Sequence, residues 1–129
     1  MKYFTIEELT RTSTGLNNKP NDEQQANLIF LADNLLDKAR ELYGKPIRVT
    51  SGFRSLAVNK KVGGVITSQH TKGEAVDLVC EDNSKLFEIF KKLKFDQLIW
   101  EKGTDKQPAW IHVSLKRNGI NRGQILRIK

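Results

Sequence analysis

Two stretches of the chain repeat apolar side chains three to four positions apart, the spacing that places them on one face of a helix. The first spans residues 22–43, with Asn21 or Asp22 as the expected N-cap. The second spans residues 84–94, with Ser84 as the expected N-cap. A capping-box pattern near the N-terminus predicts a further short helix. These helices are expected to bury their apolar faces against the rest of the domain.

Shorter stretches alternate apolar and polar side chains, which is typical of strands with one buried face. The predicted strands are residues 47–50, 75–80, 95–101, 110–115 and 124–129. In the second of them Val76, Leu78 and Cys80 fall on the core face, and Asp77 falls on the other. The last is expected at a sheet edge, where its charges discourage further pairing. The pattern as a whole predicts an α+β fold with a small, mainly antiparallel sheet backed by helices.

Length and charge narrow the organisation and the partners. With 129 residues, 38% of them hydrophobic, residues 1–129 are expected to form one domain with a proper core. The formal net charge of +7 predicts attraction to polyanions such as nucleic acid or anionic wall polymers. No nucleic-acid motif and no apolar segment of membrane-spanning length occurs, so we expect neither a specific nucleic-acid partner nor membrane insertion. The single cysteine excludes an intramolecular disulfide, and we expect a monomer.

Both histidines of the chain stand beside apolar strand patterns. His112 lies on the polar face of a predicted strand, and His70 precedes Gly73, a turn residue that can fold it back toward Asp77. Two imidazoles and a carboxylate suit a catalytic zinc ion that keeps a fourth position for water. The alternative is structural: each histidine is simply hydrogen-bonded, and Asp77 pairs with Arg54 because a buried carboxylate needs a partner.

Three blocks of sequence, in this order, resemble the M15 zinc peptidases. They are Ser51-Gly52-Phe53-Arg54-Ser55, Ser68-x-His70-x-x-Gly73-x-Ala75-x-Asp77 and Trp110-Ile111-His112. That family includes D-alanyl-D-alanine carboxypeptidases, dipeptidases and phage endolysins, and residues 45–114 resemble its compact phage and prophage branch. The resemblance implies a fold like that of Hedgehog and the D-Ala-D-Ala peptidases. It also implies one zinc ion per chain, bound by His70, Asp77 and His112.

The resemblance further implies roles for two residues near the metal, Arg54 and Ser68, and strand alternation suggests a third, Trp110. Arg54 would contact the substrate and stabilise the negative charge that develops on the scissile carbonyl, unless it is an ordinary ion-pair partner. Ser68 matches a position near the substrate, although a serine in a polar loop is equally often a turn former. Trp110 shares a face with His112 and would form an apolar wall of the cleft, or else simply pack.

The general base is where the sequence departs from the family pattern. The dipeptidase branch has a glutamate three residues before the last histidine, and Ala109 occupies that position here. Glu101, at the end of a predicted strand, is the preferred candidate, with Glu74 and Asp96 as alternatives; Glu101 could instead pair with Lys102 in solvent. The expected reaction is zinc-assisted hydrolysis of an amide bond in a peptidoglycan stem peptide, with Glu101 accepting a proton from the attacking water.

Carboxypeptidase, dipeptidase and L-alanyl-D-glutamate endopeptidase activities all remain open. The main alternative function is a non-catalytic basic binding module for nucleic acid or cell-wall polymer, with a structural metal or none, supported by the basic loop 116–123. Residues 1–8 lack the apolar run of a signal peptide. We therefore expect a protein that is cytoplasmic as synthesised and acts on the cell wall after release, by the phage-type lysis route that the resemblance implies.

Overall fold

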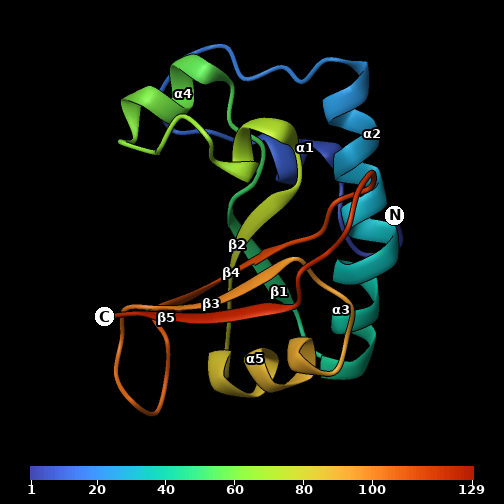
Figure 1. Cartoon of the computed structure of the whole chain (residues 1–129), viewed down its shortest axis with the longest axis vertical. Helices are drawn as coiled ribbons and strands as arrows, with labels where there is room; N and C mark the ends of the chain where they lie inside the picture. The colour runs from blue at the N-terminus through green and yellow to red at the C-terminus, as the bar shows by residue number, and fades with distance from the viewer.

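Five strands form one sheet in the computed structural model, which describes residues 1–129 (Figure 1). They are β1 (Ile47–Ser51), β2 (Ala75–Cys80), β3 (Gln97–Glu101), β4 (Trp110–Ser114) and β5 (Gln124–Ile128). Their order across the sheet is β1-β2-β4-β3-β5. The first four pair antiparallel, and β5 joins the edge of β3 in parallel. The α+β class and the mainly antiparallel sheet are thus confirmed.

Helices lie along one face and one end of this sheet (Figure 1). They are α1 (Ile6–Thr10), α2 (Asp22–Leu31), the π-helical turn η1 (Ala32–Leu36), α3 (Asp37–Tyr43), α4 (Leu56–Lys61), the 3-10 helix η2 (Gln69–Lys72) and α5 (Asn83–Lys91). The predicted long helix forms as α2, η1 and α3 in succession, capped by the side chain of Asn21, which accepts from Gln24 N–H. It ends at Gly44, whose φ of 78° is left-handed. None of the helices combines the length and apolar character needed to cross a membrane.

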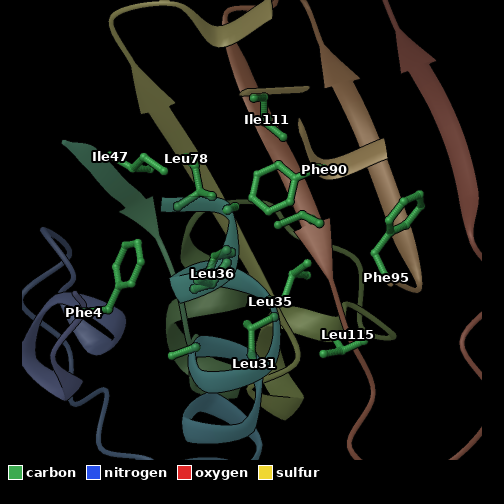
Figure 2. Close-up of a cluster of buried hydrophobic side chains, with 14 of the residues drawn as sticks. Phe4, Leu31, Leu35, Leu36, Ile47, Leu78, Phe90, Phe95, Ile111 and Leu115 are labelled. Atoms are coloured by element: carbon green, nitrogen blue, oxygen red, sulfur yellow. The ribbon is translucent and has the colours of Figure 1, made fainter. Parts of the chain in front are cut away.

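The hydrophobic core lies between the long helix and the sheet. Figure 2 shows Leu31, Leu35 and Leu36 of the helix pointing toward side chains of the strands and of α5. The sheet contributes Val76 and Leu78 from β2, as alternation predicts, and these are fully buried. The rest of the core includes Phe4, Ile47, Phe90, Phe95, Ile111, Val113 and Leu115. Because this face of the sheet is filled with apolar groups, the polar residues of β2 and β4 are left to the opposite face.

Two local features differ from the sequence prediction. The cap of α5 is Asp82 and not Ser84, because the Asp82 carboxylate accepts from Lys85 N–H and places Ser84 inside the first turn. Helix α4 was not predicted: it has six residues, and its apolar residue Leu56 is largely exposed, so it leaves no amphipathic pattern. Its start is nevertheless marked by Ser55, whose side chain accepts from Val58 N–H.

Candidate metal centre

Three side chains from three elements meet on the face of the sheet opposite the core. His70 comes from η2, Asp77 from the middle of β2 and His112 from β4. The register of the antiparallel pair sets Asp77 directly opposite His112. Gly73 ends η2 with a φ of 76°, and this left-handed turn brings the chain from His70 into β2. The fold therefore brings together the three residues expected to bind metal.

The candidate ligand atoms lie close enough together to share one zinc ion. His112 Nδ1 lies 3.1 Å from Asp77 Oδ1, and His70 Nε2 lies 3.4 Å from the same oxygen. One ligand atom from each residue lies within 4.8 Å of the other two. In a tetrahedral site with bonds of about 2.0–2.1 Å, neighbouring ligand atoms stand about 3.3 Å apart. The cluster thus fits the metal that its residue types suggest.

A hydrogen bond on the far side of the His70 ring decides which nitrogen faces the cluster. His70 Nδ1 lies 2.7 Å from the carbonyl oxygen of Gly52. Because a carbonyl only accepts, Nδ1 carries the proton and donates it. Nε2 then faces Asp77 Oδ1: with a proton it donates a hydrogen bond to this oxygen, and without one its lone pair can bind a metal ion held between the two residues. An outer partner that fixes the ring in this way is typical of a metal-binding histidine.

The two oxygens of Asp77 have different partners. Oδ1 faces the histidines, whereas Oδ2 lies 3.5 Å from Arg54 Nη2. The guanidinium is also held by Nε, which donates to Ser51 Oγ at 3.0 Å. Burial alone would raise the pKa of Asp77, but hydrogen bonding to His112 and His70 outweighs burial and holds that pKa well below its usual range. Asp77 is therefore an anion. It takes part both in the ligand cluster, through Oδ1, and in the ion pair with Arg54, through Oδ2.

Gly52 and Ser68 support His70, and both lie in the blocks that carry the sequence resemblance. A Cβ at Gly52 would stand 2.2 Å from the carbonyl oxygen of Leu9, so only glycine lets this segment pass α1. Ser68 is the N-cap of η2, and its Oγ accepts from His70 N–H at 3.2 Å. Sequence reasoning placed Ser68 near substrate and gave Gly52 no role. Both residues position His70.

A comparison with protein families agrees with this geometry. The family model described as Peptidase M15 matches residues 2–114, which include the ligand cluster, Arg54 and Glu101. The chain belongs to the M15 peptidases. Members of this family are zinc enzymes, and the His70, Asp77 and His112 cluster is able to hold such a metal. No curated protein matches the chain.

Glu101 is a carboxylate without an ion-pair partner that lies beside this centre. A cavity of about 380 Å³ opens beside His112, and Glu101 lines it. Glu101 is in β3 and diagonal to His112, because Ile99 stands opposite His112 and Glu101 opposite Trp110. Burial first, and then the charge of Asp77, raise the pKa of Glu101. A half-buried carboxylate with a raised pKa is suited to exchanging protons.

The other predicted residues of this M15 peptidase lie as follows. Ser68 lines the cavity beside Glu101, and Arg54 lines a second cavity of about 380 Å³. Trp110 begins β4 on the His112 face but lines neither cavity. Glu74 is buried and accepts from Gln69 Nε2 at 3.4 Å. Asp96 is fully buried and bound by cationic side chains, so neither alternative base lines the cavity of Glu101.

Proposed function

We propose that the chain is a zinc-dependent peptidase that hydrolyses an amide bond in the stem peptides of peptidoglycan. Membership of the M15 peptidases supports peptide hydrolysis, and the observation that carries the proposal is the His70, Asp77 and His112 cluster with Glu101 on the adjoining cavity. The cut bond is of the D-Ala-D-Ala carboxypeptidase type or the L-Ala-D-Glu endopeptidase type. A monomer that serves in phage or prophage lysis is the biological setting that the sequence resemblance favours.

The three ligand residues would hold one zinc ion per chain. Zinc supplies a Lewis acid that polarises a carbonyl group and makes a bound water acidic near neutral pH. Asp77 contributes an ionised oxygen, and the Gly52 carbonyl keeps His70 Nε2 available for binding. These residues prepare the site before any substrate arrives.

Glu101 is assigned to proton transfer, and Arg54 is assigned to the stabilisation of negative charge. We assign Glu101 as the general base, which takes a proton from the attacking water and delivers it to the leaving amine. Its carboxylate is the one that lines the same cavity as His112. We assign Arg54, which Ser51 and Asp77 hold in position, to stabilise negative charge on the scissile carbonyl oxygen. Ser68 and Trp110 are assigned to the substrate side of the site.

The contacts of loop 116–123 weigh against the alternative of a non-catalytic basic module. Lys116 and Arg122 both pair with Asp96, and Arg117 Nε donates to Asn27 at 2.8 Å. Each of these cations thus has a partner within the fold, and the donors that stay free, on Arg122, lie at the cavity instead of in an open basic surface for polyanions.

The proposal is tested by measuring peptidoglycan hydrolysis and zinc content on the same sample of the Glu101→Gln variant. Glutamine keeps the shape and cannot accept the proton, so hydrolysis of peptidoglycan should fall about 10²- to 10⁴-fold with one zinc ion per chain retained. Glu74→Gln is the matched control and should cleave like the wild type. Masses of the released fragments identify the bond. Unchanged hydrolysis by Glu101→Gln contradicts the base assignment, and zinc-loaded wild type that cleaves no wall contradicts the function.

A further inference from the structure

Arg122 lines the same cavity as Glu101 and His112, yet it lies beyond the residues matched by the family. It precedes β5, which runs beside β3 at the edge of the sheet (Figure 1). The main chain next to it is anchored, because Gly123 N–H donates to Phe95 O at 3.1 Å and Gln124 N–H donates to Asp96 O at 2.9 Å. The pairing of β5 with β3 thus carries Arg122 to the site.

The guanidinium of Arg122 is fixed by a buried carboxylate. Arg122 Nε donates to Asp96 Oδ1 at 3.1 Å, and Nη2 donates to Oδ2 at 2.7 Å. The backbone N–H of Arg122 also donates to Oδ1, at 3.0 Å. Burial alone would raise the pKa of Asp96, but the hydrogen bonds from Arg122 outweigh burial and lower that pKa to about 2. A two-point contact with a permanent anion sets the plane of the guanidinium.

Part of Arg122 stays available to a ligand. Its Nη1 has no hydrogen-bond partner in the protein, and its side chain is 49% exposed. Lys116 Nζ lies 3.9 Å from the same Asp96, so two cations face one anion and the group keeps a net positive charge. Gln69, which precedes the ligand His70, donates from Nε2 to Asp96 Oδ2 at 3.1 Å. The network therefore ties Arg122 to the helix that carries a candidate metal ligand.

We propose that Arg122 binds a carboxylate of the peptide substrate and thereby selects substrates with a carboxylate next to the scissile amide. A pre-oriented guanidinium with free donors in a cavity is suited to such a group. The inference rests on the proposed function, and both candidate bonds have a carboxylate next to the scissile amide. A carboxypeptidase substrate ends in a carboxylate, and a glutamyl residue uses one carboxyl group in the chain and keeps the other.

The test compares cleavage of matched carboxylate and carboxamide peptides. The first pair of probes is a peptide that ends in D-Ala-D-Ala with a free carboxylate and the same peptide with a C-terminal carboxamide. The second pair is a peptide that contains L-Ala-D-Glu with a free glutamyl carboxylate and the same peptide with a carboxamide in its place. Zinc-loaded wild type should prefer the carboxylate by about 10- to 100-fold in kcat/KM, the range of a hydrogen bond to a charged group. Arg122→Gln should lose this preference, and Arg122→Lys should keep a part of it.

Two features keep the outcome unambiguous. The preference is a ratio measured on one sample, so a lower folded fraction of Arg122→Gln does not alter it. Arg127→Gln is the matched control: Arg127 also pairs with an aspartate, Asp105, but outside the cavity, and its variant should retain the wild-type preference. Equal cleavage of both forms by the wild type, or a preference kept in Arg122→Gln, overturns this inference alone. Failure of the wild type to cleave any of the peptides or peptidoglycan overturns the proposed function, and this inference with it.

Discussion

Two buried aspartates lie near the same cavity and have opposite surroundings. Asp77 faces two imidazoles through one oxygen, and its one cationic neighbour, Arg54, stands at 3.5 Å from the other. Asp96 takes a two-point contact from Arg122 and a further hydrogen bond from Gln69. Permanently charged donors satisfy Asp96 within the protein. The imidazoles beside Asp77 are not permanently charged, and their nitrogens can bind a metal ion in place of a proton.

The difference shows how a structural ion pair is distinguished from a metal site. Burial and a lowered pKa are common to both aspartates, so neither property identifies the site. The decisive observation is the direction of a lone pair: Gly52 holds the proton of His70 on Nδ1, and Nε2 is left facing Asp77. The residues that contact the carboxylate, histidines at Asp77 and an arginine at Asp96, therefore indicate whether it can bind a metal ion.

The largest expected effect comes from Asp77→Asn. Asparagine keeps the shape but removes the anionic ligand, so zinc affinity should fall by more than the roughly 10- to 100-fold typical of losing an outer partner. Hydrolysis should be lost with it. Zinc bound after dialysis against a weak chelator provides the measurement. Asp96→Asn is the control and should retain zinc; equal zinc loss in both variants would remove the distinction between the two aspartates.

A smaller effect, on stability, is expected for Asp96→Asn. Removing the carboxylate leaves Arg122 and Lys116 without their buried anion, at a cost of about 3 kcal/mol in the free energy of unfolding. Hydrogen bonds from Arg122 hold the pKa of Asp96 at about 2 in the folded protein, below the ordinary value of 3.8 for an aspartate. Its stabilisation is therefore complete above about pH 4 and is lost as the pH falls toward 2. Denaturant unfolding at pH 7 and pH 3 measures this, and a cost that does not shrink at the lower pH would contradict it.

Gly52→Ala tests the outer support of the metal cluster. The new Cβ would meet Leu9 O at 2.2 Å, so the Gly52 carbonyl must shift away from His70 Nδ1. We expect zinc affinity to fall about 10- to 100-fold, as for other outer partners. Competition with a zinc-binding dye gives the affinity. Gly15→Ala is a useful comparison because its Cβ meets nothing within 4 Å, and it should lower stability without changing zinc affinity.

The smallest effect is a shift in the acid limb of the pH profile. A base must be deprotonated, and burial raises the pKa of Glu101 above the ordinary value of 4.5 for a glutamate. Hydrolysis should therefore rise with pH through a pKa above that value. Asp96→Asn should leave this limb unmoved, because burial and Asp77 are the causes of the shift. If the acid limb shifts in Asp96→Asn, the group that titrates there lies beside Asp96, and the assignment of this limb to Glu101 is contradicted.

The strands and the meeting of Asp77 with His112 were predictable because both follow short-range rules. Alternation placed Asp77 and His112 on the polar face, and the structure pairs them directly. The π-helical turn at Ala32–Leu36 and the short helix Leu56–Lys61 leave no such pattern and depend on tertiary packing. Arg122 was taken only as part of a basic loop. Its place in the cavity depends on parallel pairing of β5 with β3 and on Asp96, contacts that no local spacing encodes.

The central claim is that His70, Asp77 and His112 form the metal centre of the chain. Crystals of the zinc-loaded protein, measured with X-rays on both sides of the zinc absorption edge, test it most directly. We expect one anomalous peak per chain, bonded to His70 Nε2, Asp77 Oδ1 and His112 Nδ1 at about 2.0–2.2 Å. A peak elsewhere, or no peak while the two histidines contact Asp77 alone, would contradict it.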